Sequence, residues 1–144
     1  MVSGRKVQAV IHRSGPEFLL LHYSPPKNYW QSLTGNLQDG EDEKEGLMRE
    51  ITEETGLPEL GIVRFSRAGS FEFTARGRSY SETVYSVLVR GESMVDLSGN
   101  PDHEHNAYGW FDPLVAQRLV RWDITRSAIR EIASTVTDPD PKES

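Results

Sequence analysis

Three glutamates near the middle of the chain are spaced so that they could act together. Glu50, Glu53 and Glu54 stand at positions i, i+3 and i+4, so a helix would bring their carboxylates onto one face. Such carboxylates repel one another, and each raises the pKa of its neighbours unless a cation compensates. Magnesium and manganese ions prefer oxygen ligands and keep several waters, which suits a site that must also hold a polyphosphate. The three glutamates are therefore candidate metal ligands.

The segment around these glutamates is expected to be a helix, because residues 41–55 contain no proline and many good helix formers. Asp39-Gly40 is a turn signal before it, acidic residues in its first turn suit the helix dipole, and Gly56 ends it. Arg49 stands four residues before Glu53, so it can pair with that carboxylate and orient it. The alternative interpretation of the cluster is a solvated acidic helix face, which is the usual meaning of a charge run.

The spacing of identities around this helix resembles the signature of the Nudix hydrolases. Residues 35–57, GNLQDGEDEKEGLMREITEETGL, fit the pattern G-x5-E-x7-R-E-U-x-E-E-x-G-U, with U aliphatic, at every fixed position. A match at so many set positions would arise by chance in roughly one window in a billion. The resemblance implies an α/β/α sandwich with a mixed β-sheet and a loop-helix-loop box. It also implies a pyrophosphohydrolase that needs magnesium or manganese.

The same resemblance implies roles for the residues of the signature. The metal ligands would be the three clustered carboxylates, Glu50, Glu53 and Glu54. Glu53, Glu54 and the orienting Arg49 would be catalytic, in a reaction where water attacks one phosphorus of a diphosphate linkage. Gly35 would permit a backbone turn that brings the preceding loop near the phosphates, and Glu41 would be a supporting ligand.

Four residues outside the helix are further candidates. Glu104 lies in an acidic loop before an expected strand, where it could complete the metal site or take a proton from water; otherwise it is a surface acid. Lys27, Tyr29 and Trp30 follow a proline-rich stretch and lead to Gly35, so they are expected near the mouth of the site. The lysine could meet phosphate and an aromatic ring could stack on a base. Their alternative interpretation is a surface lysine and a tryptophan packed under the loop.

The composition is that of one globular domain. The chain has 144 residues, of which 36% are hydrophobic and 26% charged, as is ordinary for a soluble single domain. We expect this domain to cover residues 1–136. Residues 137–144 carry three acidic residues and two prolines, so a frayed C-terminal tail is expected there.

The net charge and the absence of cysteine limit the kinds of partner and site that we expect for this protein. The chain has no cysteine, which excludes disulfides, thiolate metal sites and cysteine nucleophiles. Its net charge of -6 argues against a general nucleic-acid-binding surface. The family resemblance implies a small nucleoside or pterin polyphosphate as the partner. No run approaches membrane-spanning length and the first residues lack the apolar core of a signal peptide. A cytoplasmic monomer or homodimer is therefore expected.

The rest of the chain alternates between strand and turn patterns. Strands are expected at residues 6–12, 17–23, 29–34, 60–66, 70–74, 79–90 and 107–111. Asp112-Pro113 supplies an N-cap and a first-turn proline for a short helix through about Val120. A last helix is expected over residues 125–134, with Ile124, Ala128 and Ile132 on its apolar face. This order is an α+β arrangement, which agrees with the sandwich that the resemblance implies.

Two further stretches are similar to one branch of this family, the dihydroneopterin triphosphate pyrophosphohydrolases. Residues 30–35, WQSLTG, resemble the WQSVTG that leads into the signature there, and residues 104–110, EHNAYGW, resemble its EHxAYxW element. The second element is shared with diadenosine tetraphosphate hydrolases. The resemblance implies hydrolysis of a pterin or nucleoside triphosphate to the monophosphate and pyrophosphate. A diadenosine polyphosphate hydrolase and a catalytically silent nucleotide sensor are the alternatives.

Overall fold

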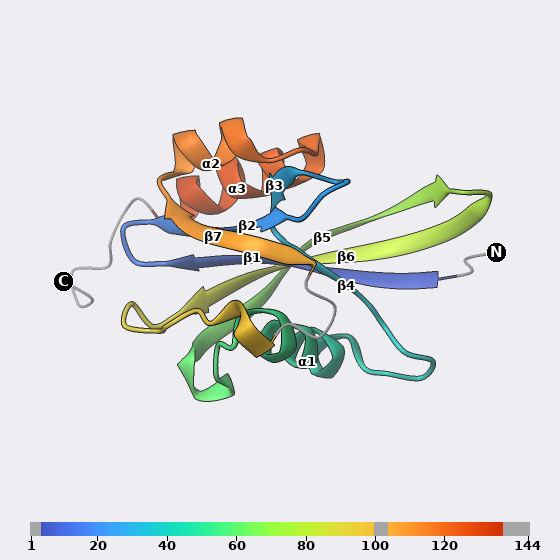
Figure 1. The fold of residues 1–144 in the computed structure, drawn as a ribbon, viewed down its shortest axis with the longest axis horizontal. Helices are drawn as coiled ribbons and strands as arrows, with labels where there is room; N and C mark the ends of the chain where they lie inside the picture. The colour runs from blue at the N-terminus through green and yellow to red at the C-terminus, as the bar shows by residue number, and fades with distance from the viewer. Residues whose placement is uncertain (1–3, 100–103, 137–144) are drawn as a thin grey trace.

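The fold is a mixed β-sheet with helices on both faces, described by a computed structural model for residues 4–99 and 104–136. The strands are β1 (Gly4–Arg13), β2 (Glu17–Tyr23), β3 (Tyr29–Gln31), β4 (Leu33–Asn36), β5 (Ile62–Ala75), β6 (Arg78–Val89) and β7 (His105–Phe111). The helices are α1 (Glu43–Thr55), α2 (Pro113–Leu119) and α3 (Asp123–Val136), with short 3-10 helices η1 (Glu59–Gly61) and η2 (Leu97–Gly99). Figure 1 shows α1 below the sheet and α2 and α3 above it. The expected α+β sandwich is confirmed.

The topology centres on β1. The strand order is β3-β2-β1-β6-β5, while β4 pairs with β1 and β7 pairs with β2. The first half of β1 runs antiparallel to β4, from Lys6 opposite Asn36 to Ala9 opposite Leu33, and its last residues pair with β2. On its other edge β1 runs parallel to β6. This arrangement sets β4, which leads into α1, beside the start of the central strand.

The core has two layers, one on each face of the sheet, because neighbouring strand residues point to opposite faces. On the α1 side, Leu47 and Ile51 of the helix are buried in one cluster with Val7 of β1. On the side of α2 and α3, Ile129 is buried in a second cluster with Val10 of β1. Since the two clusters share no buried residue, a side chain can be placed on a face by the cluster it joins.

The structure corrects the expectation of separate strands at residues 60–66 and 70–74. Residues 62–75 form one strand, β5, which pairs with β6 along its whole length. Its register shifts between Arg67 and Gly69, so the turn-like residues form a bulge instead of a loop. The turn that does follow lies at Arg76 and Gly77, whose φ angles of 52° and 75° suit a tight hairpin.

The last helix matches its expected apolar face only in part, since Ile132 is buried and Ala128 packs against the second cluster, but Ile124 does neither. It begins at Asp123, and its buried residues on the sheet side are Thr125, Ile129, Ile132 and Ala133, whereas Ile124 is 41% exposed. The helix packs on the sheet through the face that contains Ile129, because this face buries a longer apolar stripe than the expected face would. The expected tail at residues 137–144 and the acidic loop residues Asp102 and His103 lie outside the described residues. No helix in residues 4–99 or 104–136 is both long and apolar enough to span a membrane.

Candidate active site

Helix α1, which carries the acidic cluster, is held by contacts at both ends. Asp42 is its N-cap, and its carboxylate accepts hydrogen bonds from the backbone N–H groups of Lys44 and Glu45, each at 3.1 Å. Glu43 in the first turn accepts hydrogen bonds from Thr83 Oγ1 at 2.6 Å and Tyr85 Oη at 2.8 Å, which ties the helix to β6. Gly56 closes the helix in the left-handed conformation, with φ of 71°.

The helix brings its three glutamates together, as their spacing predicted. One carboxylate oxygen from each of Glu50, Glu53 and Glu54 lies within 4.8 Å of the others. Glu54 is 4% exposed, and its buried Oε2 accepts no well-aligned hydrogen bond from the described residues, although His105 Nδ1 lies 3.3 Å away. Burial raises the pKa of Glu50, against the opposing effect of Arg49. Three convergent carboxylates with an unsatisfied buried oxygen fit a hard divalent cation.

Arg49 spans the cluster. Its Nη1 lies 3.0 Å from Glu50 Oε1 and 3.3 Å from Glu53 Oε2, the second being the contact expected from the spacing. Its Nε and Nη2 donate to Glu41 Oε2 at 2.9 Å and Oε1 at 3.0 Å, a two-pronged pair. Hydrogen bonding from Arg49, followed by that from the Gln38 N–H, lowers the pKa of Glu41 to about 2. Both carboxylate oxygens of Glu41 thus accept hydrogen bonds from Arg49, so Glu41 supports the cluster by holding that arginine in place.

Gly35 is needed for a different reason from the one the sequence suggested. It lies within β4 opposite Val7, and it is not among the glycines with positive φ, so the expected backbone turn at this position is wrong. A Cβ atom on Gly35 would lie 2.5 Å from both Cγ and Cδ of Glu50. The glycine therefore leaves the space in which the Glu50 carboxylate rests against the strand.

A second grouping adds residues from β7 and the loop before it. Ligand atoms of Glu54, Glu104 and His105 lie within 4.8 Å of one another, and His105 Nδ1 is 3.3 Å from Glu54 Oε2. The side chain of Glu104 is 41% exposed, and Lys27 Nζ lies 3.7 Å from its Oε1. The Ser24 N–H donates to the Glu104 carbonyl at 2.7 Å, which fixes the loop. His105 was missed by sequence reasoning, although it stands inside the EHNAYGW stretch.

The two aromatic candidates lie on opposite faces of the sheet. Tyr29 packs on the α1 side, with its ring 5.4 Å from that of Tyr23. Trp30 packs on the side of α2 and α3, and its ring meets those of His22 at 5.1 Å and Phe111 at 5.3 Å. The structure thus brings Tyr29, but not Trp30, to the face that α1 covers.

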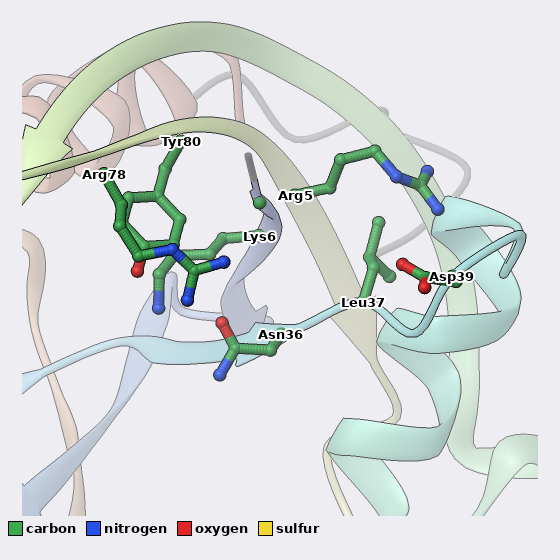
Figure 2. Close-up of a pocket in the computed structure, with 8 residues that line it drawn as sticks. Arg5, Lys6, Asn36, Leu37, Asp39, Arg78 and Tyr80 are labelled. Atoms are coloured by element: carbon green, nitrogen blue, oxygen red, sulfur yellow. The ribbon is translucent and has the colours of Figure 1, made fainter. Parts of the chain in front are cut away.

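A pocket of about 570 Å³ lies where the starts of β1 and β6 meet the end of β4. Figure 2 shows Lys6, Arg78 and Tyr80 on one side of it, and Arg5 and Asp39 toward α1. Arg5 Nη2 donates to the carbonyls of Gln38 at 3.3 Å and Glu41 at 2.9 Å, so the pocket borders the loop that carries Glu41. Sequence reasoning missed Arg5, Lys6 and Tyr80, because nothing in their local pattern sets them apart from ordinary strand residues.

A known domain family matches nearly the whole chain: the model described as NUDIX domain covers residues 2–132. A dihydroneopterin triphosphate diphosphatase from Escherichia coli K12 is 26% identical over 125 residues, covering 78% of this chain and 80% of that protein. An asymmetrical bis(5'-nucleosyl)-tetraphosphatase from Caenorhabditis elegans is 28% identical over 120 residues, covering 82% and 83%. An octanoyltransferase from Myxococcus xanthus is 33% identical over 116 residues, but the chain spans only 31% of its length.

A solved structure shows the same fold. The C. elegans Ap4A hydrolase binary complex has a TM-score of 0.76 at 24% sequence identity, and the match covers 92% of this chain and 97% of that one. The helix with its acidic cluster therefore stands on a scaffold shared with a known protein of this architecture.

Proposed function

Because the chain belongs to the Nudix family of pyrophosphohydrolases, we propose that it hydrolyses a pterin or nucleoside triphosphate to the monophosphate and pyrophosphate. Water would add its oxygen to the inner phosphorus, and pyrophosphate would leave. The observation that carries this proposal is the set of convergent carboxylate oxygens of Glu50, Glu53 and Glu54, braced by Arg49. Such a set is suited to a substrate whose negative charge must be compensated.

The proposed metal ligands are the three helix carboxylates together with Glu104. Bound magnesium or manganese would offset charge on the phosphate oxygens and lower the pKa of a coordinated water. Arg49 keeps Glu50 and Glu53 oriented, since one of its nitrogens lies between their oxygens. Glu104 is proposed either as a fourth ligand or as the base that takes the proton from water, because it is partly exposed and adjoins Glu54.

Substrate contacts are proposed for Lys27 and Tyr29. The exposed ammonium of Lys27 lies beside Glu104, where it could meet a phosphate. Tyr29 lies on the α1 face and is partly exposed, so its ring could stack on a base. Trp30 is left out of this role because it packs on the opposite face.

A diadenosine polyphosphate hydrolase is the second candidate, favoured by the tetraphosphatase relative at 28% identity. The two candidate functions differ in the groups that the protein must bind beside the phosphates. A triphosphate carries one ring system, whereas diadenosine tetraphosphate carries two nucleosides and would give ATP as one product. The pterin or nucleoside triphosphate is preferred because the WQSLTG stretch resembles the WQSVTG of the pterin branch.

Glu53→Gln tests the metal site. The change keeps the size of the side chain and removes one charged ligand, so turnover at saturating magnesium should fall by about a hundredfold or more while circular dichroism stays unchanged. Glu45→Gln is the matched control, since Glu45 is an exposed glutamate of the same helix. If Glu53→Gln keeps more than about a tenth of the wild-type rate, the assignment of this ligand is wrong.

A substrate comparison tests the reaction. Catalytic efficiencies on dihydroneopterin triphosphate, deoxynucleoside triphosphates and diadenosine tetraphosphate should rank the last one lowest. A clear preference for diadenosine tetraphosphate would favour the second candidate. Hydrolysis in oxygen-18 water should label the monophosphate, because the inner phosphorus is attacked; label found only in pyrophosphate would contradict this step.

A further inference from the structure

Positive charge gathers in the pocket at the starts of β1 and β6 (Figure 2). Among the described residues that line it, Arg5, Lys6 and Arg78 are basic, whereas Asp39 is acidic. The chain as a whole carries a net charge of -6, so this local excess of cations runs against the overall charge. A cavity lined mainly by one sign of charge concentrates small ions of the opposite sign. The pocket therefore favours an anion.

Two of these cations lie over one aromatic ring. Lys6 Nζ is 5.3 Å and Arg78 Cζ is 5.8 Å from the centroid of Tyr80. The ring has room because residue 4 is glycine, where a Cβ atom would lie 2.6 Å from Tyr80 Cδ1. Figure 2 shows the side chains of Lys6, Arg78 and Asn36 directed toward the same space beside this ring. Tyr80 thus forms a wall of the pocket, and two cations rest against it.

The acidic side chains nearby leave these cations available. Within residues 4–99 and 104–136, neither Arg5 nor Lys6 has a carboxylate partner at ion-pair distance. Glu82 is the register partner of Lys6 on β6, and the charge of Lys6 opposes the rise in the pKa of Glu82 that burial causes. Glu82 is 6% exposed and does not line the pocket. An anion in the pocket would therefore meet the cations first.

The pocket is separate from the acidic cluster but contacts the same loop. None of the three clustered glutamates lines it. Asn36, at the end of β4, lines the pocket with its side chain, while its carbonyl accepts a hydrogen bond from Arg49 Nη2 at 3.3 Å. Arg5 Nη2 donates to the Glu41 carbonyl at 2.9 Å. These contacts fix one side of the pocket to the segment that leads into α1.

We propose that this pocket is a second anion site, which binds the phosphates of a di- or triphosphate through Arg5, Lys6 and Arg78 without a metal ion. Guanidinium groups form two-pronged hydrogen bonds with phosphate oxygens, and an ammonium adds a compact charge. A volume of about 570 Å³ is typical of sites for whole small molecules, so free pyrophosphate and the diphosphate of a nucleotide both fit. Binding here needs no hydrolysis, so the site goes beyond the proposed function.

Nuclear magnetic resonance of the isotope-labelled protein in EDTA locates the site. Titration with pyrophosphate should shift the backbone amide signals of residues 4–6, 36–39 and 78–80 and leave those of residues 104–108 unchanged. ADP and adenosine separate the sources of phosphate: ADP should bind at least as tightly as pyrophosphate, and adenosine should not bind. Affinity for ADP above that for pyrophosphate would assign the site to nucleotides, and equal affinities would assign it to the free anion as well. Shifts centred on residues 104–108, or no shift with either phosphate compound, would overturn the proposal.

Variants that remove charge test the individual residues. Lys6→Met and Arg78→Met should each weaken pyrophosphate binding in EDTA by about tenfold, measured by calorimetry, with circular dichroism as the check on folding. Arg78 is exposed beside the hairpin turn, so its variant keeps the test open even where Lys6→Met fails to fold. Arg130→Met is the matched control, because it changes an exposed arginine of α3, and it should keep the wild-type affinity.

Lys27→Met separates this pocket from the acidic cluster. Lys27 lies beside Glu104, so its loss should leave pyrophosphate binding in EDTA unchanged if the anion occupies the pocket. Binding that falls in Lys27→Met but not in Lys6→Met or Arg78→Met would place the anion at the cluster and overturn the proposal. Because EDTA removes the metal that hydrolysis needs, a failed anion site and a failed hydrolase assignment are separate results.

Discussion

The guanidinium of Arg49 offsets charge at the acidic cluster through three of its nitrogens. Two of them form the pair with Glu41, and the third lies beside Glu50 and Glu53. A planar fork can make these contacts at once, whereas the single ammonium of a lysine could not. Because the pKa of Glu41 is lowered to about 2, the Glu41 carboxylate stays ionised and paired with Arg49 throughout the neutral range. The carboxylates of Glu50, Glu53 and Glu54 then face one another in an arrangement that suits a cation.

Gly35→Ala should disturb the proposed metal site without damaging the fold. The added methyl group would lie 2.5 Å from Glu50 Cγ and Cδ, so the Glu50 side chain must move out of the cluster. We expect the magnesium concentration for half-maximal rate to rise by about tenfold or more, measured by titrating turnover with magnesium. The midpoint of thermal unfolding should change little, because an extended strand position accepts alanine.

Gly69→Ala is the control for this change. Gly69 also lies in a strand without positive φ, and a Cβ there would meet nothing within 4 Å. It should keep the wild-type response to magnesium. A Gly35→Ala protein whose magnesium titration matches that of Gly69→Ala would show that Glu50 does not need its present position.

Sequence reasoning at the residue scale succeeded where spacing along one helix decides the outcome. The three glutamates lie together because their separations follow the helical repeat. The pair of Glu54 with His105 could not be derived in this way, since it depends on how β7 docks beside α1. The reason for Gly35 was likewise hidden, because it depends on a side chain fifteen positions further along.

Elements were predictable where their signals are local. The C-terminal end of α1 was predicted from Gly56, whereas its start, expected at residue 41, lies at Glu43 because Asp42 is the N-cap. The continuous β5 was not predictable, because turn-like residues at 67–69 become a bulge only when β6 pairs on both sides of them. The buried face of α3 was predicted only in part for a related reason: Ile132 is buried as expected, but docking on the sheet, not periodicity alone, buries Ile129 and leaves Ile124 exposed.

Gly46 shows how a local preference can yield to packing. A glycine inside a helix costs about 1 kcal/mol relative to alanine, so propensity alone argues against it. In the structure a Cβ on Gly46 would collide with Leu37 Cδ2 and lie 3.0 Å from the Glu41 carboxyl group. The glycine therefore lets the loop before α1 lie close against the helix, where Glu41 can reach Arg49.

The arrangement of the whole molecule brings together residues from distant parts of the sequence. The parallel pairing of β1 with β6 brings residues more than seventy positions apart into register, such as His12 with Leu88. No local pattern in the sequence specifies that pairing. It places His12 in the interior, 2% exposed, with a ring nitrogen 2.8 Å from Ser86 Oγ and its ring 5.7 Å from that of Phe18.

This buried histidine should make the fold sensitive to acid. Burial, followed by the charge of Arg64, lowers the pKa of His12 from its ordinary value of 6.5 to about 4. Below pH 6.5 His12 becomes protonated in the unfolded chain but stays neutral in the folded protein down to about pH 4. The stability that is present at neutral pH is therefore lost as the pH falls toward 4. At pH 5 the free energy of unfolding should be lower than at pH 7 by about 2 kcal/mol from this residue alone.

His12→Gln isolates that contribution. Glutamine can still bond to Ser86 but does not titrate, while every other ionisable group is common to both proteins. Urea unfolding at pH 7 and pH 5 should therefore show a loss of stability on acidification that is smaller in the variant by about 2 kcal/mol. The variant is expected to be somewhat less stable at pH 7, so the difference between the two pH values is what counts. Equal losses in both proteins, with unchanged m-values, would mean that His12 accepts its proton inside the fold.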